Sequence, residues 1–316
     1  MSRICLVGGS GFLGCNVAEI LVRQGHSVIV PTRNRERAKR DLILLPTVDV
    51  VAANVYDDAA LDRLMAGCDT VINFVGVLHS RSGSPLGRDF VRAHIELPYR
   101  LTTACGRLGI RRLIHISALG AGPGAPSQYL RSKAEGEARV LSSNLDVTVF
   151  QPSIVFGPDD SFLNLFARLQ KFLPVMVLAM PDARLQPVYV EDVARAIFAS
   201  IWDDESYGKV FPLAGPKVYT LRQLVRFAGE QSGNARPIVG LPLALSKLQG
   251  AVMGLLPIKL MTLDNVRSLM VDNVSATAFP FGIEPTALES IAPGYLRGVW
   301  PRTRFDRYRH RAGRHV

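Results

Sequence analysis

Tyr129 and Lys133 are the pair of side chains in this sequence with the most definite chemistry. They lie four residues apart on a predicted helix, so the phenol and the ammonium share one face. A nearby cation favours the phenolate and lowers the pKa of a phenol from its usual value near ~10. Ser117 follows the strand before that helix, where its hydroxyl would orient the same substrate oxygen. The three residues predict a site for proton exchange with a carbonyl or an alcohol.

A glycine-rich turn near the amino terminus predicts the element that positions this site. The apolar run Ile4–Val7 leads into three glycines in the spacing G-x-x-G-x-x-G, within the segment Gly8, Gly9, Ser10, Gly11, Phe12, Leu13 and Gly14. Gly8 permits the tight turn, Gly11 lets the backbone approach a pyrophosphate, and Gly14 lets the next helix pack on the strand. That helix directs its free N–H groups and its dipole at the pyrophosphate. The turn therefore predicts a dinucleotide site, with hydride transfer at the nicotinamide and Lys133 holding its ribose.

The end of the second predicted strand, over residues 27–33, indicates which dinucleotide the turn would hold. An acidic residue is expected about 20 residues past the turn when the adenosine ribose carries a free 2′-hydroxyl. This chain has Arg33 there, followed by Asn34, and a guanidinium binds a 2′-phosphate through charge-assisted hydrogen bonds. We therefore expect NADP(H) rather than NAD(H). The alternative is a solvated basic face formed by Arg33, Arg35, Arg37, Lys39 and Arg40.

The later strands are expected to end beside the same ligand. A strand over residues 48–53 runs into Asn54 and Val55, which would flank the adenine, and a strand over residues 70–75 contains Phe74 and leads to Gly76. Ligands bind at the carboxyl ends of the strands in open α/β sheets. Strands and helices alternate throughout residues 1–157, which predicts an α/β, Rossmann-type doubly wound parallel sheet with right-handed crossovers.

The second half of the chain predicts a smaller mixed lobe over residues 158–316, part of which, within 186–215, returns to the main sheet. Thr220 to Gln223 predicts a capping box that opens a helix ending before Gly233. A later apolar stripe is interpreted as packing inside the lobe, with a helix lying in a membrane surface as the alternative. The stripe consists of Leu248, Ala251, Val252, Leu255 and Leu256, between Lys247 and Lys259.

Charge is concentrated at the carboxyl terminus. The net charge is +10, and the last twenty residues carry seven arginines against one aspartate together with Trp300, Phe305 and Tyr308. Such a tail suits an anionic surface, such as lipid headgroups, an acidic protein or nucleic acid. Of these we expect contact with a membrane surface or an acidic protein, rather than with nucleic acid. The alternative is a disordered, solubilising end.

Targeting and metal-binding signals are missing from the sequence. The glycine turn begins at residue 8, which leaves no room for a signal peptide, and no apolar run approaches the ~20 residues that span a bilayer. We expect a cytoplasmic protein, peripheral on the inner face of the membrane. The four cysteines are scattered with no C-x-x-C pair, so we expect neither a disulfide framework nor a metal site.

The sequence resembles the short-chain dehydrogenase/reductase superfamily in its extended or atypical branch. The motifs fall in that family's order: the glycine turn, Asn73-x-x-Gly76, Ser117, Tyr129-x-x-x-Lys133 and residues 152–157. The resemblance implies that Ser117, Tyr129 and Lys133 are the catalytic residues, with Pro152 and Ile154 among the cofactor contacts. His94 stands where active members place an asparagine that supports a proton relay, and we interpret it as a helix residue packed beside the sheet.

Residues 129–137, 156–164 and 186–193 are similar to the NADPH-binding accessory subunits of respiratory complex I and their bacterial relatives. In that branch the dinucleotide is thought to be structural, the carboxy-terminal part lies near the membrane and the quinone region, and a nearby relative works in ubiquinone biosynthesis. The resemblance implies an accessory protein that holds NADP(H) and contacts a respiratory complex or a membrane surface through its C-terminal lobe and tail. Two alternatives remain: an NADP(H)-dependent oxidoreductase that acts through Tyr129 and Lys133 on a quinone, isoprenoid or other carbonyl substrate, and an NADP(H) redox sensor.

Overall fold

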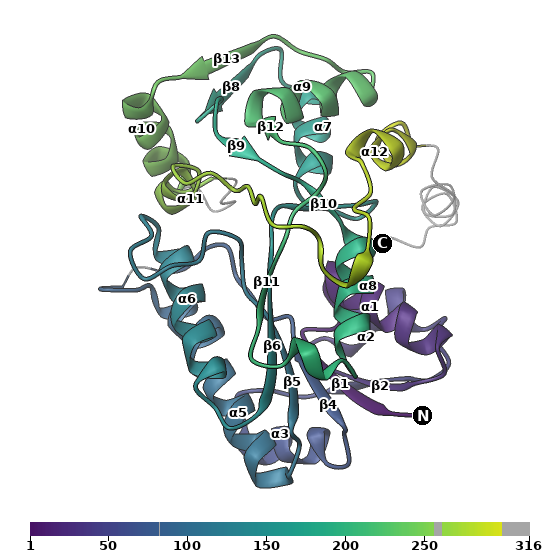
Figure 1. Ribbon diagram of the computed structural model, residues 1–316. Helices are drawn as coiled ribbons and strands as arrows, with labels where there is room; N and C mark the ends of the chain where they lie inside the picture. Colours follow the sequence, from purple (N-terminus) through teal and green to yellow (C-terminus); the bar gives the residue numbers. More distant parts are fainter. Residues whose placement is uncertain (82, 256–260, 299–316) are drawn as a thin grey trace. The chain divides into compact units, whose positions relative to one another are not determined.

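The structure is a computed structural model that describes residues 1–81, 83–255 and 261–298 (Figure 1). The chain divides into two compact units. Unit 1 comprises Met1–Pro152, Val190–Leu213 and Ser275–Glu284, and unit 2 comprises Ser153–Tyr189, Ala214–Val274 and the residues from Pro285 onward.

A seven-stranded parallel sheet forms the centre of unit 1. Its strand order is β11-β6-β5-β4-β1-β2-β3. The order reverses at β1, which lies between β4 and β2, and this reversal is the point where doubly wound sheets bind nucleotides. The predicted Rossmann-type fold is therefore confirmed. The strands are β1 (Arg3–Val7), β2 (Ser27–Thr32), β3 (Val48–Ala52), β4 (Thr70–Asn73), β5 (Arg112–Ile116), β6 (Asp146–Pro152) and β11 (Val210–Leu213).

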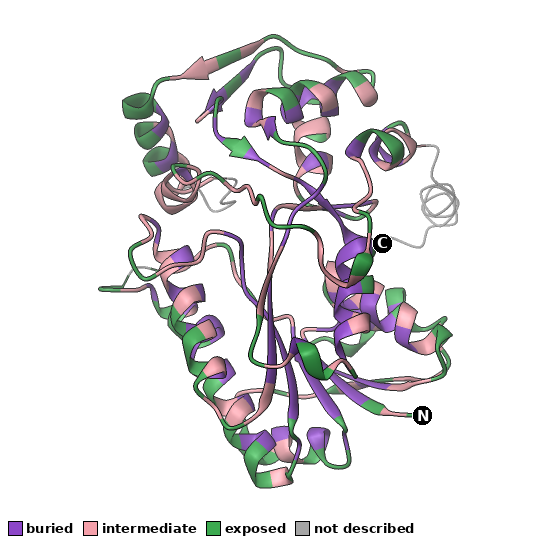
Figure 2. Ribbon diagram, in the orientation of Figure 1, coloured by how far each residue is buried: buried purple, intermediate pink, exposed green. Residues whose placement is uncertain are grey.

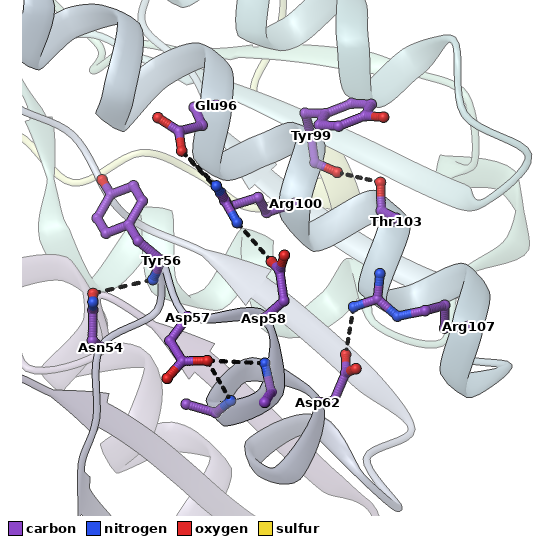
Figure 3. A network of polar contacts seen from close by, with 12 residues as sticks. Asn54, Tyr56, Asp57, Asp58, Asp62, Glu96, Tyr99, Arg100, Thr103 and Arg107 are labelled. Atoms are coloured by element: carbon purple, nitrogen blue, oxygen red, sulfur yellow. Dashed lines mark hydrogen bonds and ion pairs between the residues drawn. The ribbon is translucent and has the colours of Figure 1, made fainter.

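Helices cover both faces of this sheet (Figure 1). The central strands are buried on both sides, which explains their continuous apolar sequences (Figure 2). One layer contains α1 (Phe12–Arg23), α2 (Arg35–Leu42) and α8 (Val190–Ser200), and the other contains α3 (Asp58–Met65), α5 (Leu97–Leu108) and α6 (Gln128–Leu141). Two ion pairs join α3 to α5, Arg100 with Asp58 at 2.7 Å and Arg107 with Asp62 at 2.7 Å (Figure 3).

The helical stretch between β4 and β5 is interrupted by a π-helical segment. It consists of α4 (Arg88–Phe90), η1 (Val91–Glu96) and α5. Pro98 has no N–H, so it cannot make the α-helical hydrogen bond to the carbonyl of His94 four residues earlier. That carbonyl faces α6, where a Cβ added to Gly136 would lie 1.9 Å from the His94 oxygen. The backbones of the two helices are therefore in direct contact at this point.

The described part of unit 2 consists of short paired strands and helices. The predicted capping box is confirmed, since the Thr220 hydroxyl accepts from the Gln223 N–H at 3.2 Å and the Gln223 side chain accepts from the Thr220 N–H at 2.7 Å. The strand pairs are β7 (Val155–Phe156) with β10 (Val188–Tyr189), β9 (Arg184–Leu185) with β12 (Tyr219–Thr220), and β8 (Met176–Ala179) with β13 (Ile238–Leu241). The helices are α7 (Leu163–Phe172), α9 (Leu221–Gln231), α10 (Leu243–Met253), α11 (Leu263–Ser268) and α12 (Leu288–Leu296). Short 3-10 turns, η2 (Asp204–Ser206) and η3 (Pro280–Gly282), belong to unit 1.

The apolar stripe on α10 does not pack inside the lobe, so that prediction is wrong. Leu248, Val252 and Leu255 are 59%, 56% and 87% exposed. The buried residues of α10 are Ser246 and Gly250, and a Cβ at Gly250 would lie 2.8 Å from a methyl group of Val266 on α11. Because small residues make the close contact, the larger apolar side chains are left pointing outward. Leu256, Lys259 and residues 299–316 of the basic tail lie outside the described residues.

None of the helices in the described ranges has the length and apolarity required to cross a bilayer.

Candidate functional site

The glycine turn joins β1 to α1 at the reversal point of the sheet. Gly8 has a φ of +84°, which is the left-handed region that favours glycine, and a Cβ there would lie 3.1 Å from the backbone nitrogen of Val75. A Cβ on Gly14 would lie 2.5 Å from the Cα of Gly9, so α1 packs directly on the turn. Both glycines are required by the fold of the chain itself.

Gly11 is different, and its environment fits a dinucleotide. A Cβ at Gly11 would touch only the carbonyl oxygen of Gly8, at 3.3 Å, and Gly11 is exposed. It is the N-cap residue of α1 with φ −86°, and no side chain caps that helix end. Packing within the described protein therefore does not demand a glycine here. A bare backbone and uncapped helix N–H groups suit the close approach of a pyrophosphate.

The predicted adenosine contacts lie at the ends of β2 and β3. Arg33 follows β2 and is exposed, while the Asn34 side chain caps α2 by accepting from the Arg37 N–H at 3.0 Å. Asn54 and Val55 follow β3, and the Asn54 side chain accepts from the Tyr56 N–H at 3.2 Å (Figure 3). Of these residues, Arg33 is the one placed to offer a charged group to a 2′-phosphate.

A second cation reinforces the positive potential near Arg33. The guanidinium carbon of Arg92, on η1, lies 4.1 Å from the ring centroid of Tyr56. Burial raises the pKa of Tyr56 and the negative charge of Glu96 adds to the rise, whereas the positive charges of Arg92, Arg33 and Arg100 oppose it. Arg33 and Arg92 therefore both contribute positive charge beside the end of β3, where Glu96 is ion-paired with Arg100.

The predicted catalytic residues lie just after β5 and on helix α6. Ser117 follows β5, while Tyr129 and Lys133 lie on α6. The Lys133 ammonium donates to the carbonyl of Ile116 at 3.0 Å, and it lies 3.1 Å from the position a Cβ would take on Gly76. Ser117 and Lys133 are each 4% exposed, and the Ser117 hydroxyl has no partner among the described residues.

The pKa values differ from the expected activation of Tyr129. Burial raises the pKa of Tyr129 to about 12, which is opposite to the lowered value expected from Lys133. Burial also lowers the pKa of Lys133 to about 8, against the opposing charge of Glu137. The expectation was wrong because spacing on a helix shows which side chains share a face and not how far each is removed from water. In this state of the chain the phenol is a weak acid.

Two histidines that sequence reasoning did not place in the site are part of it. His94 accepts from the Val77 N–H through Nε2 at 3.0 Å, its Nδ1 lies 2.8 Å from the Ser132 hydroxyl, and its ring meets Tyr129 edge-on at 5.6 Å. These bonds confirm a packed helix residue and leave its Nε2 unavailable for a proton relay. His115 lies on β5 opposite Asn73 of β4 and is 1% exposed. A polar residue within the apolar run of β5 was the available signal for His115.

The other predicted cofactor contacts make hydrogen bonds through their main-chain groups at or near the strand ends. Pro152 ends β6, where its carbonyl accepts from the Leu119 N–H at 3.0 Å. Phe74 extends the β1–β4 ladder by donating its N–H to the Val7 carbonyl at 2.8 Å. Ile154 belongs to unit 2, where its N–H donates to the Asn273 side chain at 3.2 Å. Its role toward a cofactor stays a prediction.

The chain is similar to known proteins over most of its length. Residues 4–211 match the NAD dependent epimerase/dehydratase family. The mouse (Mus musculus) mitochondrial NADH dehydrogenase [ubiquinone] 1 alpha subcomplex subunit 9 is 32% identical over 89% of this chain and 76% of its own length. The 40 kDa subunit of mitochondrial NADH-ubiquinone oxidoreductase from Neurospora crassa is 26% identical over 95% of this chain and 80% of its own length.

Among solved structures, a nucleoside-diphosphate-sugar epimerase of Staphylococcus aureus superposes with a TM-score of 0.69 at 18% identity. The match covers 93% of this chain and 99% of that one. The family description makes a nicotinamide dinucleotide the cofactor class, and it leaves open which phosphorylation state is bound. The chain belongs to the NAD dependent epimerase/dehydratase family, in the atypical branch of the short-chain dehydrogenases/reductases.

Proposed function

We propose that this protein is an accessory subunit of a respiratory NADH:quinone oxidoreductase, in which NADP(H) is a structural ligand. The observation that carries the proposal is the state of the Tyr129 phenol. Burial raises its pKa to about 12, so the charge of Lys133 does not bring that pKa below its ordinary value. A phenol with so high a pKa is a weak general acid at neutral pH, which suits retention of the nucleotide better than turnover. The similarity to subunits of the mitochondrial enzyme over most of the chain supports the same role.

The choice of NADP(H) rests on Arg33. Its exposed guanidinium follows β2, and Arg92 adds positive potential beside Tyr56. A 2′-phosphate would accept charge-assisted hydrogen bonds from Arg33, whereas a neutral 2′-hydroxyl would offer the guanidinium no ion pair. Arg33→Ala should lower the affinity for NADPH by about 10- to 100-fold and leave the affinity for NADH unchanged. Arg37→Ala, one turn into α2, is the matched control and should change neither. A preference for NADH in the wild type would overturn the choice.

Contact with a membrane is supported by the exposed apolar side chains of unit 2. They lie at the end of α7 and in the segment after it, on the paired strands β8 and β13, and on α10 and just after it: Phe172, Leu173, Val175, Val177, Val239, Leu243, Leu245, Leu248, Val252 and Leu255. Val177 and Val239 are register partners, so the two strands present a joint apolar surface. Exposed apolar side chains gathered in one unit mark contact with lipid or protein. The seven arginines of the last twenty residues add attraction to anionic headgroups.

The structural role is tested by purifying the protein and measuring its bound nucleotide. We expect NADP(H) that exchanges over hours and is not oxidised by quinones or carbonyl compounds. Tyr129→Phe should retain the nucleotide as the wild type does. Turnover in the wild type that disappears in Tyr129→Phe, with the nucleotide still bound, would overturn the structural role and support the oxidoreductase.

The oxidoreductase is the second candidate because the Ser117 hydroxyl is buried without a partner in the described chain beside Lys133. A substrate carbonyl would accept a hydrogen bond from that hydroxyl.

A further inference from the structure

The side chains of Asn73 and His115 have a defined orientation at the centre of the sheet. They are register partners on β4 and β5, and the Asn73 Nδ2 atom lies 3.1 Å from His115 Nδ1. The other end of the Asn73 amide is fixed, because its Oδ1 accepts from the Val75 N–H at 3.1 Å. Asn73 therefore donates to Nδ1 of His115. A neutral imidazole that accepts at Nδ1 carries its proton on Nε2.

The His115 Nε2–H group is buried without a hydrogen-bond partner in the described structure. His115 is 1% exposed, and a donor in that position is costly to leave unpaired. The ring stays neutral, because burial and the charge of Lys133 lower the pKa of His115 to about 3. Nε2 is therefore a donor that needs an acceptor.

Two further polar groups lie beside it. Ser117 is two residues after His115 in an extended segment, so both side chains leave the same face of the sheet, and the Ser117 hydroxyl also has no partner in the described chain. Lys133 donates one of its three N–H groups to the carbonyl of Ile116, the residue between them. His115, Ser117 and Lys133 thus present unused donors to one region that solvent barely reaches.

We propose that His115, Ser117 and Lys133 hold one buried water molecule, which fixes the Lys133 ammonium. Water suits this place because each of the three side chains is 4% exposed or less, and its oxygen can accept from two of the donors while one of its O–H groups donates to the Ser117 hydroxyl. The bonds of His94 to Val77 and Ser132 keep that imidazole from serving the same water. His115 is a positioning residue for Lys133. Its effect on nucleotide retention rests on the proposed function, in which Lys133 holds the nicotinamide ribose.

A crystal structure of the full chain without added nucleotide tests the water site directly. We expect a water oxygen within about 3.2 Å of His115 Nε2 and of Ser117 Oγ or Lys133 Nζ. In the wild type labelled with ¹⁵N-histidine, His115 should show the Nε2–H tautomer and a magnetisation-transfer peak to a long-lived water. A site filled by protein atoms, or an Nδ1–H tautomer, would overturn the proposal. Neither measurement depends on a variant that folds.

The positioning role is tested by nucleotide release. His115→Phe should release bound NADPH about threefold to tenfold faster than the wild type, the range expected from one hydrogen bond. Thr148→Val is the matched control, because Thr148 is equally buried in β6 and bonds to Arg112 and Ser206 instead. Equal release from His115→Phe and the wild type would overturn the positioning role. A wild type that binds no dinucleotide would refute the proposed function while the crystal structure still decides the water site.

Discussion

The backbone N–H of Val77 donates to Nε2 of His94 at 3.0 Å and so ties the segment after β4 to the π-helical turn. The same ring reaches Ser132 on α6, and the Ser132 hydroxyl donates to the carbonyl of Tyr129 at 2.8 Å. One imidazole therefore connects the loop that carries Gly76 with the helix that carries Tyr129 and Lys133. Burial, with the charges of Lys133 and His115, lowers the pKa of His94 to about 2, which keeps the ring neutral and able to accept.

Replacing His94 by Phe should loosen this loop. Phe fills a similar volume but leaves the Val77 N–H without its acceptor, at a cost of about 1–3 kcal/mol. Amide hydrogen exchange at Val77 should accelerate by about tenfold or more. The Leu113 amide in the centre of β5 serves as the internal reference. Unchanged protection at Val77 would show that the bond does not hold the loop.

Acid should destabilise the protein through its two buried histidines. Burial lowers the pKa of His94 to about 2 and of His115 to about 3, whereas both titrate near ~6.5 when unfolded. The unfolded chain therefore binds more protons below pH ~6.5, and the free energy of unfolding falls as the pH drops towards ~3. Each histidine contributes a slope of about 1.4 kcal/mol per pH unit once its unfolded form is protonated.

Urea unfolding between pH 4.5 and 7 measures this slope. His115→Phe should reduce it by about 1.4 kcal/mol per pH unit, because one titrating group is removed. Thr148→Val shifts stability without changing the slope. Equal slopes in the wild type and His115→Phe would exclude His115 as a source of acid sensitivity.

Two glycines of the turn should respond differently to alanine. Gly14→Ala places a Cβ 2.5 Å from the Cα of Gly9, which should lower the free energy of unfolding by about 1–3 kcal/mol. Gly11→Ala meets only the Gly8 carbonyl at 3.3 Å, so it should cost less stability than Gly14→Ala, about 0.5–1 kcal/mol from the preference for glycine over alanine at an N-cap. Its affinity for NADPH should nevertheless fall by about tenfold or more, because the methyl group occupies the approach of the pyrophosphate. Calorimetry with and without the nucleotide separates the two effects, and normal NADPH affinity in Gly11→Ala would refute the assigned role of that residue.

A buried hydrogen bond between Tyr295 and Asp160 should stabilise unit 2. The Tyr295 hydroxyl donates to Asp160 at 2.7 Å, and the same carboxylate accepts from the Leu163 and Phe162 N–H groups at the start of α7. Tyr295→Phe should lower the free energy of unfolding by about 1.5–3 kcal/mol, the range for a bond to a charged group. Tyr219→Phe, whose hydroxyl donates to the exposed Glu289 at 2.8 Å, is the comparison and should cost less. Equal losses in urea would contradict this ranking.

Binding to anionic vesicles should depend on unit 2 and on the tail. Deleting residues 301–316 or changing Leu248 and Val252 to Ser should each weaken flotation with phosphatidylserine-containing vesicles. Changing Ile43 and Leu44 to Ser is the control, because these side chains are 70% and 83% exposed but belong to unit 1. Flotation that survives both changes in unit 2 and its tail would refute the membrane contact.

The fold could be predicted from the sequence where a position accepts only one type of residue. Gly8 and Gly14 are required by backbone geometry, and the strand ends follow from apolar runs that stop at polar or small residues. The sequence-based predictions failed where a property depends on which other parts of the chain bury a side chain. The α10 stripe has the periodicity of a buried face, but Gly250 decides which side of the helix meets α11. The pKa of Tyr129 depends on burial, which helix spacing does not report, and the orientation of His115 depends on Asn73 from another strand.

Because Gly136 has no side chain, the backbone of α6 lies directly against the π-helical turn, and the distance between the two is fixed by their main chains. Any added atom at this position would push the whole helix outward, since the obstacle is the His94 carbonyl and main chain cannot rotate away as a side chain does. Tyr129 and Lys133 would then be displaced together as one rigid group. A change in substrate or ligand preference would therefore have to come from substitutions in the loops around α6, and not from larger residues between α6 and the π-helical turn.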